Sequence, residues 1–327
     1  MTDQAQIASS IDLGATPPSS APTAGGWKRY KPATFYAFVT PWVLGFVGLT
    51  VFPLAFALWM SFTNYDGVSK TSGVGLDNYT RALQDPGLHH ALGVTLALMA
   101  ITVPVGIILG LVLAMLLNLE FRYARPVYRA LLYLPSILPV TAGALAFRMV
   151  FDQDVGPVNA LLIDAGFNAV TWFEGGPSFW ILLAFMFWGV GGNMIISLAA
   201  LQSVPRELVE AAVVDGAGAW RRFWSITVPI LSPILLFQFV TGVISALQMF
   251  VPAMLMGNSN MAGLDPTGVP EGLQVYMLHV YMTYFSFGEF GYASAMLWLL
   301  FIIIVLFTAL VFWVTRGRIF YASDMEG

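Results

Sequence analysis

Residues 297–314 read LWLLFIIIVLFTALVFWV, a run of 18 residues that contains no charged side chain. The charge-free stretch around this run extends from residue 290 to residue 315. About 20 apolar residues in a helix cross the roughly 30 Å hydrocarbon core of a bilayer. The apolar positions are continuous rather than alternating, which disfavours a strand of a closed barrel. The stretch therefore predicts a membrane-spanning helix.

Five more stretches without Asp, Glu, Lys or Arg lie upstream in the chain, and each contains a long apolar run. They are residues 32–65, 86–119, 130–147, 175–205 and 223–264. In lipid, only helices and closed barrels satisfy all of their backbone hydrogen bonds. We therefore predict an all-α integral membrane protein with six transmembrane helices. The predicted spans are residues 35–62, 90–118, 129–151, 178–202, 226–256 and 291–315.

The composition of the 327-residue chain agrees with this class. Hydrophobic residues make up 58% of the chain and charged residues 10%, and the mean hydropathy is +0.76. Soluble domains are about 45–50% apolar and about 25% charged. The polar fraction is too small to cover a soluble core, which argues against a cytosolic enzyme, a nucleic-acid-binding protein and a disordered chain. The chain has no cysteine, so it has no disulfides, zinc–thiolate sites or cysteine nucleophiles.

A further charge-free stretch, residues 272–288, is shorter than the others and rich in Tyr and Phe. It also contains His279. Its length and composition predict an interfacial or re-entrant segment rather than a seventh span.

The positions of Lys and Arg predict the orientation of the spans, because cytoplasmic loops carry an excess of these residues. With six spans, both termini lie on one side of the membrane. Eleven of the 14 basic residues would lie on that side: Lys28, Arg29, Lys31, Arg122, Arg125, Arg129, Arg206, Arg221, Arg222, Arg316 and Arg318. The other side would hold Lys70, Arg81 and Arg148. We therefore expect both termini to be cytoplasmic.

The chain ends differ in composition from the rest. Residues 1–30 are rich in Ser, Thr, Ala, Pro and Gly, and they are predicted to be a disordered cytoplasmic tail. They lack the basic start and apolar centre of a signal peptide. Residues 31–320 are predicted to form one six-span domain, and residues 321–327 a cytoplasmic C-terminal tail.

The sequence lacks the residues that ATP hydrolysis, metal binding and proton-coupled transport need. The three lysines are Lys28, Lys31 and Lys70, and none follows a glycine-rich phosphate loop, so the chain is not expected to hydrolyse ATP. His89 and His90 are adjacent and have no carboxylate at a ligand spacing, so we interpret them as a polar helix entry and not a metal site. The spans hold almost no ionisable residue, which weakens the case for a proton-coupled carrier.

The predicted cytoplasmic loop at 202–225 separates the fourth and fifth spans. Ser203 is expected to cap a first short helix that has Pro205 in its first turn and Glu207 early in it. Gly216 and Gly218 allow a tight reversal before a second, amphipathic segment runs into the fifth span. Apolar residues give the first helix one face: Leu208, Ala211, Ala212 and Val214. From these residues alone, the loop could equally lie on lipid headgroups or contact another protein.

The stretch EAAVVDGAGAWRRFWSITVPILSP, residues 210–233, resembles the EAA loop of permeases from binding-protein-dependent ATP-binding-cassette (ABC) importers. The matching positions are Glu210, Ala211, Ala212, Asp215, Gly216, Ala217, Ile226 and Pro229. Val228 stands where the family usually has Leu. A pattern of this length between the fourth and fifth of six spans is highly specific.

Three other segments resemble the carbohydrate-uptake class of these permeases. They are GLDNY at 75–79, YLPSILP at 133–139 and GPVNALL at 156–162. Together with the EAA loop they cover most of residues 35–315. The chain departs from the family after the fifth span, where GNSNMAGLDP at 257–266 replaces a T-x-GGP segment. The resemblance implies the type I importer permease fold.

The resemblance also implies partners and a mechanism. Such importers contain a second homologous permease, two ATP-binding subunits and an extracytoplasmic solute-binding protein, in a bacterial or archaeal cytoplasmic membrane. The partner subunits would bind ATP and Mg, and this chain, in contact with membrane lipid, would need no cofactor and no nucleic acid. Solute would move inward by alternating access. Glu210, Ala211, Ala212, Asp215 and Gly216 would form the loop that couples to the ATPase.

A sugar path needs aromatic faces for stacking and amides or hydroxyls for hydrogen bonds, and such groups should face the bundle interior. Five residues of the fourth and fifth spans fit this need: Trp188, Asn193, Ser245, Gln248 and Phe250. Four prolines are expected to kink or interrupt helices: Pro104, Pro135, Pro139 and Pro252.

The sequence alone leaves the solute open. A sugar or sugar-derived compound is favoured, including disaccharides, oligosaccharides and glycerophospho-type compounds. An ABC permease for amino acids or peptides is the alternative, and a secondary carrier is less favoured.

The predicted orientation can be tested by cysteine labelling, because the native chain has no cysteine. Single cysteines at residues 70 and 265 should react with impermeant thiol reagents in intact cells. Single cysteines at residues 20 and 322 should react only after lysis. The opposite labelling pattern would show that the orientation is reversed.

Overall fold

The computed structural model describes residues 32–118, 125–257 and 268–316. The predicted tails at 1–30 and 321–327 lie outside these residues. The described residues are helical and contain no β-strand, only an isolated bridge between Thr63 and Gly73. The chain divides into two units, residues 1–55 and residues 56–327.

The described part of the first unit is one end of a long apolar helix. It contains α1 (Pro32–Phe46), the π-helical turn η1 (Val47–Val51) and the start of α2 (Phe52–Ser61). With the rest of α2 these elements form a candidate span over Ala33–Ser61. Most of its side chains are exposed, including Phe38 and Leu49. A helix that is apolar on all sides and exposed in the isolated chain fits a lipid environment.

The second unit holds the remaining spans. Among the described residues the whole chain has five helices that are long and apolar enough to cross a membrane, and six if one bent pair counts as a span. The six-helix prediction is therefore confirmed. In the second unit these elements are α4 (Pro86–Asn118), α5 (Arg125–Ile137) with α6 (Val140–Val150), α8 (Pro177–Trp188) with α9 (Gly191–Gln202), α11 (Ala219–Arg222) with η2 (Phe223–Thr227), α12 (Val228–Leu247) and α13 (Val251–Gly257), and α15 (Phe290–Thr315).

The third predicted span, 129–151, differs from a straight helix. Helices α5 and α6 meet at an angle of 96°. Pro139 lies between them with a φ of −54° and a ψ of 131°, outside the helical region. Proline has no backbone N–H to continue the helix, and it disfavours helical geometry at the residue before it. The other expected breaks vary. Helix α4 continues through Pro104 and α5 through Pro135, whereas Pro252 is the second residue of α13, directly after a break.

The fourth span is broken between α8 and α9, and a serine of the third span compensates for the break. The Ser136 hydroxyl donates to the Gly189 carbonyl at 3.0 Å and accepts from the Gly192 N–H at 2.9 Å. Both groups would otherwise lack partners in an apolar environment, at a cost of several kcal/mol each. The YLPSILP segment therefore supplies both the bend of the third span and the closure of this break.

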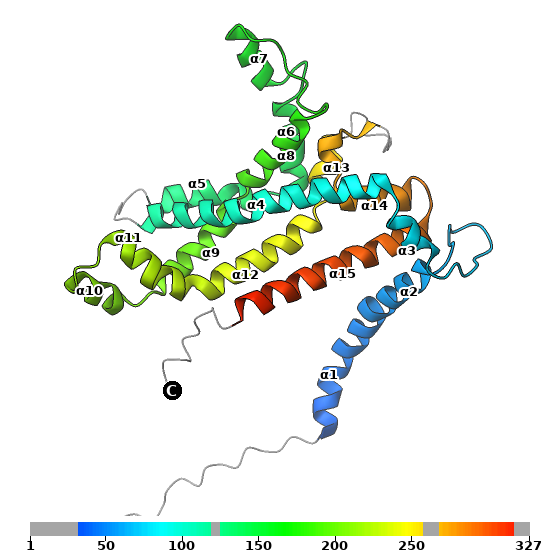
Figure 1. Ribbon diagram of the computed structural model, residues 1–327, viewed down its shortest axis with the longest axis horizontal. Coiled ribbons are helices and arrows are strands. Elements are labelled where there is room, and N and C mark those ends of the chain that lie inside the picture. Colours follow the sequence, from blue (N-terminus) through cyan, green and yellow to red (C-terminus); the bar gives the residue numbers. More distant parts are fainter. Residues whose placement is uncertain (1–31, 119–124, 258–267, 317–327) are drawn as a thin grey trace, which may run out of the picture. The chain divides into compact units, whose positions relative to one another are not determined.

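Helix α4 is the centre of the second unit. It packs against α9, α12 and α14 (Tyr276–Phe285), and Figure 1 shows it running beside these helices. Helix α14 belongs to the segment at 272–288, and its ten residues are too short to span a bilayer. Tyr276 anchors it: its backbone N–H donates to the Thr95 hydroxyl, and its own hydroxyl donates to the Met296 carbonyl, both at 2.8 Å.

Two asparagines, one in the GLDNY segment and one in the GPVNALL segment, stabilise loops by hydrogen bonds. The positions of Lys and Arg predict that these loops lie outside the membrane. Asn78, in α3 (Asp77–Ala82), donates to the carbonyls of Ser61 and Thr63 at the end of α2. Asn159, in α7 (Pro157–Asp164), is 2% exposed and makes four hydrogen bonds, to Gln153, Val170 (two) and Trp172. Both residues therefore have structural roles in this chain.

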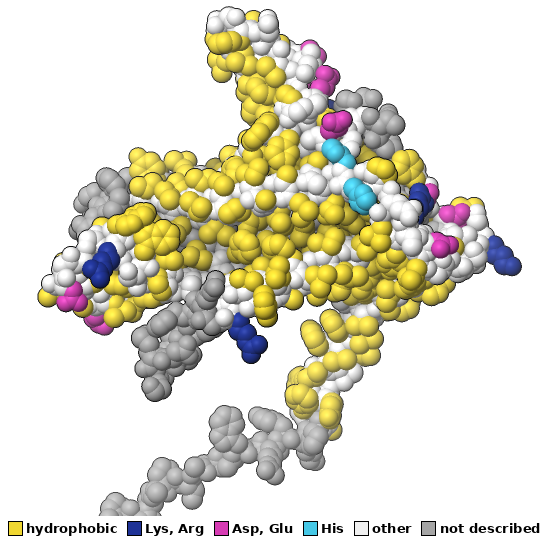
Figure 2. All heavy atoms as spheres, in the orientation of Figure 1, with side chains coloured by type: hydrophobic (Ala, Val, Ile, Leu, Met, Phe, Trp, Pro, Cys, Tyr) yellow, Lys and Arg dark blue, Asp and Glu magenta, His cyan; other side chains and the backbone are white. Residues whose placement is uncertain are grey.

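Side chains on the surface follow the pattern expected in a membrane. On the face shown in Figure 2, hydrophobic side chains cover the length of the long helices of the second unit, and charged side chains gather near their ends. Many large apolar residues of α4, α12 and α15 are exposed, among them Ile108, Phe237 and Leu306. An apolar surface of this extent is stable against lipid and unfavourable in water.

A small polar cluster ties the start of α4 to α14 and α15. One Asp85 oxygen accepts from the N–H groups of Gly87 and Leu88 and so caps α4, and the other accepts from the Tyr292 hydroxyl at 2.7 Å. His279 Nε2 lies 3.8 Å from the same carboxylate. Partial burial raises the pKa of Asp85, but the hydrogen bonds and His279 outweigh burial, so the pKa lies below its ordinary value. Burial lowers the pKa of His279 although Asp85 opposes this.

Replacing Asp85 tests this cluster. Asp85→Ala removes the helix cap and the bond to Tyr292, and should cost about 1–3 kcal/mol of stability. Because folding lowers the carboxyl pKa, the stabilisation is present above its ordinary value of about 3.9 and is lost as pH falls through the folded value. Thermal unfolding in detergent should therefore show a gap between wild type and variant at pH 7 that shrinks below about pH 4.

Asp85→Asn is the matched control, because its amide oxygen can still accept from the N–H groups of Gly87 and Leu88. It should lose less stability than Asp85→Ala. Equal melting temperatures for Asp85→Ala and wild type at pH 7 would contradict a stabilising role for the cluster.

Candidate functional site

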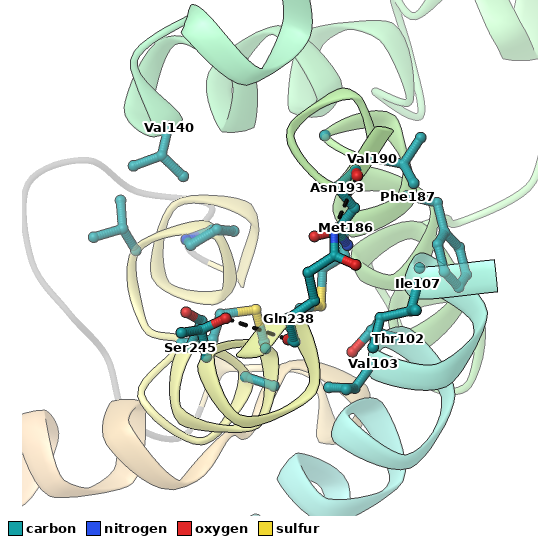
Figure 3. A pocket seen from close by; sticks show the side chains of 18 of the residues that line it. Thr102, Val103, Ile107, Val140, Met186, Phe187, Val190, Asn193, Gln238 and Ser245 are labelled. Carbon is teal, nitrogen blue, oxygen red and sulfur yellow. Dashed lines mark hydrogen bonds between the residues drawn. The ribbon is translucent and has the colours of Figure 1, made fainter. Parts of the chain in front are cut away.

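A cavity of about 450 Å³ lies between α4, α9 and α12 of the second unit. Three of the five path residues expected from sequence line it: Asn193 on α9, Ser245 on α12 and Phe250 between α12 and α13. Figure 3 shows Asn193 on the wall opposite Ser245, with Thr102 and Ile107 of α4 on a third side. The volume falls within the range of about 300–1,000 Å³ that small-molecule sites occupy.

The cavity lies where the spans are interrupted. Val140 follows the bend of the third span, Gly189 and Val190 form the break of the fourth, and Met249 and Phe250 form the break of the fifth. All five residues line the cavity. Interrupted helices in a membrane are tolerated where they are buried in protein or line a polar cavity. Three such interruptions at one place therefore mark the cavity as a candidate solute site.

Gln238 holds the cavity wall together and was not among the residues expected from sequence. It is 2% exposed, and its amide nitrogen donates to the Asn193 carbonyl at 2.9 Å and lies 3.3 Å from the Ser197 hydroxyl. These bonds join α12 to α9. The sequence did contain a signal, because Gln238, like Gln248, is an amide in the otherwise apolar fifth span.

A glycine brings α4 close to the same wall. A Cβ atom at Gly110 would lie 2.8 Å from the Asn193 Cβ and 3.0 Å from the Asn193 carbonyl carbon. No larger residue fits there without displacing the backbone of α9. Small residues permit this kind of close approach between membrane helices.

Two polar groups of the cavity are free to bind a solute. The Thr102 and Thr241 hydroxyls donate to carbonyls of their own helices, those of Leu98 and Phe237. By contrast, the Asn193 side-chain amide and the Ser245 hydroxyl have no hydrogen-bond partner among the described residues. Because Phe250 also lines the cavity, the cavity offers a donor, acceptors and an aromatic side chain.

The other two expected path residues lie elsewhere. Trp188 packs with Phe147 and Phe185, with ring centroids 5.3 and 6.2 Å away, and lines a neighbouring cavity of about 200 Å³. Gln248 is exposed at the C-terminal end of α12 and does not line the central cavity. The structure therefore brings Asn193, Ser245 and Phe250 together, and it separates Trp188 and Gln248 from them.

The loop between the fourth and fifth spans contains the two short helices that were expected. Helix α10 (Arg206–Val214) is followed by its C-cap Asp215 and then by Gly216, which has a φ of +75°. The Gly216 N–H donates to Val213 and the Ala217 N–H to Ala212, at 3.0 and 2.9 Å. This pair of bonds is a Schellman motif, in which glycine readily takes the left-handed position. Arg222 of α11 donates to the Ala217 carbonyl at 2.9 Å and fixes the turn.

Two local expectations for this loop were wrong. Ser203 does not cap α10, because its hydroxyl donates to the Ala200 carbonyl and so belongs to the end of α9. Pro205 occupies the N-cap position instead, with a ψ of 127°. Gly218 has a φ of −64° and makes no left-handed turn, so the reversal depends on Gly216 alone.

The surface of this loop is open. Glu210, Ala211, Asp215 and Gly216 are exposed and Ala212 is half-buried. Glu210 forms no ion pair with another described residue, and it lines a groove of about 540 Å³ between α10 and the ends of α4 and α9. Large apolar side chains of the same loop are also exposed, namely Val213, Val214, Trp220 and Trp224. The loop thus presents both a carboxylate and exposed apolar side chains, on helices joined by a rigid turn.

Residues 103–318 match the profile of a protein family described as the binding-protein-dependent transport system inner membrane component. This range contains α9, α12, the cavity wall and the loop around Glu210. The chain belongs to this family. It is therefore a membrane permease subunit, whose role is transport rather than catalysis.

Curated relatives extend the similarity over almost the whole permease. The probable ABC transporter permease protein YesP of Bacillus subtilis is 35% identical, over 89% of this chain and 93% of that protein. The arabinooligosaccharides transport system permease protein AraP of Bacillus subtilis is 31% identical, over 88% and 91%. The lactose transport system permease protein LacF of Rhizobium radiobacter is 31% identical, over 89% and 97%.

A solved structure has the same fold as this permease. The match is to a crystal structure of a bacterial ABC transporter involved in the import of the acidic polysaccharide alginate. The TM-score is 0.74 at 22% identity, over 87% of the permease and 95% of the matched chain. The expected ABC importer permease fold is therefore confirmed.

Proposed function

We propose that this permease moves a sugar or a sugar-derived solute inward across the membrane, driven by ATP hydrolysis in separate subunits. The observation that carries the proposal is the central cavity. There, three interrupted helices surround an aromatic ring and an amide and a hydroxyl that have no partner in the described part of the chain. Sugar hydroxyls pair with amide and hydroxyl groups, and the C–H face of a sugar ring packs on aromatic rings. None of the described residues that line the cavity is charged.

The relatives support a sugar over other solutes. AraP and LacF are described as transport permeases for arabinooligosaccharides and lactose, and both align with nearly the whole chain. An amino acid carries an ammonium and a carboxylate, and in a site of low dielectric both need charged or strongly polar partners. The uncharged cavity wall therefore disfavours amino acids and peptides. Membership of a binding-protein-dependent family disfavours a secondary carrier.

The loop around Glu210 supports coupling to an ATPase. An exposed carboxylate can accept charge-assisted hydrogen bonds from a partner arginine, and the exposed apolar side chains of the same loop can be buried against a partner. The Schellman turn keeps this surface rigid, so a rigid-body movement of the partner is transmitted to the spans. The proposed assembly contains a second permease, two ATP-binding subunits and a solute-binding protein. Both termini are proposed to be cytoplasmic.

The proposal is tested by uptake with the complete importer reconstituted in vesicles. A panel of labelled lactose, trehalose, maltose and arabinotriose should include at least one sugar that enters in an ATP-dependent manner. A panel of labelled amino acids and dipeptides should not enter. Uptake of an amino acid without uptake of any sugar would overturn the sugar assignment.

The cavity assignment predicts a specific loss. Asn193→Leu removes the free amide and should leave a sugar hydroxyl unpaired, at a cost of about 1–3 kcal/mol or roughly a tenfold to hundredfold weaker apparent affinity. The half-saturating sugar concentration for uptake measures this effect. Thr308→Val is the control, because Thr308 lies on α15, which contributes no residue to the cavity. Unchanged uptake in Asn193→Leu would remove Asn193 from the solute path.

The coupling assignment predicts a different loss. Gly216→Val should be strained by about 1–2 kcal/mol at a φ of +75°, and Glu210→Ala should remove a contact worth about 1.5–3 kcal/mol. Both variants should insert normally, because neither residue lies in a span. We expect weaker co-purification of the ATP-binding subunits or loss of ATPase stimulation by the binding protein, with the larger effect in Gly216→Val.

Matched controls lie next to both residues. Gly218→Val introduces the same side chain where φ is −64° and a Cβ atom meets nothing within 4 Å, so it should be tolerated. Glu207→Ala removes another exposed carboxylate of α10 that the EAA pattern does not include. Wild-type stoichiometry together with wild-type stimulated activity in Gly216→Val would contradict the coupling role.

A further inference from the structure

A row of aromatic rings leads away from the central cavity. Successive ring centroids lie 4.7 Å apart from Phe250 to Tyr281, 4.6 Å from Tyr281 to Phe285, and 4.8 Å from Phe285 to Tyr284. The row continues to Phe290 at 4.4 Å and to Tyr65 at 5.8 Å. We refer to these six residues as the aromatic row.

The two ends of the aromatic row have different surroundings. Phe250 lines the central cavity. At the other end, Tyr65 lies in the loop after the first span and Phe290 begins α15. The distribution of basic residues assigns this loop and the start of α15 to the outside of the membrane. The row therefore joins the cavity to the side from which a solute enters.

Most of the aromatic row is not part of a closed core. Phe285 is 65% exposed, and Tyr281, Tyr284 and Phe290 are half-buried. The hydroxyls of Tyr281 and Tyr284 have no hydrogen-bond partner among the described residues. Two other tyrosines of the same region differ in this respect, because the hydroxyls of Tyr276 and Tyr292 bond to the Met296 carbonyl and to Asp85. The free hydroxyls can therefore bind a ligand.

We propose that the aromatic row is a second sugar-binding surface, along which a sugar passes from the outside to the central cavity. The inference rests on the proposed function. Sugar rings present an apolar C–H face that packs on an aromatic ring and hydroxyls that pair with tyrosine hydroxyls. Neighbouring rings 4.6–4.8 Å apart let a sugar ring make contact with the next aromatic ring before it leaves the last. No charged group is needed for such a path.

The test uses the complete importer in vesicles with the four labelled sugars, lactose, trehalose, maltose and arabinotriose. Phe285→Leu removes a ring of the row and keeps apolar bulk, whereas Phe285→Trp keeps an aromatic face. Phe287→Leu is the matched control, because Phe287 is 60% exposed two residues away and has no ring contact with the row. The amount of assembled importer is measured for every variant.

Phe285→Leu should raise the half-saturating concentration of the transported sugar about twofold to tenfold, with an unchanged amount of assembled importer. Phe285→Trp should stay near wild type, and Phe287→Leu should match wild type. An unchanged half-saturating concentration in Phe285→Leu would overturn the proposal. Phe285→Leu and Phe287→Leu could instead both reduce the amount of assembled importer without changing the half-saturating concentration. The rings would then only anchor the protein in the membrane, and this result would also overturn the proposal.

Failure of the wild-type importer to take up any of the four sugars is a separate outcome. It would count against the proposed sugar function itself, and the role of the aromatic row would fall with it. If wild type takes up a sugar and the two leucine variants have the same half-saturating concentration, the proposed sugar function is retained and only the role of the aromatic row is rejected. The two failures are therefore distinguishable.

Discussion

Backbone hydrogen bonding without water is the constraint on which the rest of this structure depends. A helix that is interrupted within a membrane leaves N–H and C=O groups without partners, at a cost of several kcal/mol each. This chain interrupts its third, fourth and fifth spans. At the fourth span, Ser136 provides both a donor and an acceptor for the broken backbone. Beyond the break of the fifth span, Arg148 of α6 donates to the Leu255 carbonyl at 3.0 Å and links α13 to α6.

The interruptions and the central cavity are two aspects of one arrangement. Residues from all three breaks line the cavity, so the polar backbone of the breaks and the polar side chains of the wall share one space. Gln238 joins two walls through the Asn193 carbonyl and leaves the Asn193 side chain free. A buried amide with satisfied bonds stiffens a wall, whereas an amide without a protein partner is available to a solute. Gln238 therefore stabilises the wall, and the neighbouring Asn193 side chain is available for binding.

The polar residues of the family-like segments divide in a similar way. Asn78, Ser136 and Asn159 bond to backbone groups of distant loops and breaks, and so they maintain the fold. Glu210 has no ion-pair partner among the described residues and lies on α10, the helix that precedes the turn at Gly216. Some residues of a family pattern therefore make hydrogen bonds within the protein, and others are left available to bind other molecules. The contacts in the folded chain distinguish the two kinds.

The sequence alone determined the class of the protein, the positions of its spans and the family pattern of the loop between the fourth and fifth spans. Charge-free stretches have the length that a bilayer requires, and the EAA pattern depends on residues close in the chain, so neither needs tertiary information. The cavity was predictable only in part: Asn193, Ser245 and Phe250 line it, but Trp188 and Gln248 do not, and Gln238 was missed. A helix break at Pro139 was predicted, but neither its angle of 96° nor the aromatic row was. These features depend on how helices distant in sequence pack together, because the direction of a side chain in a bundle is set by its neighbours and not by its own span.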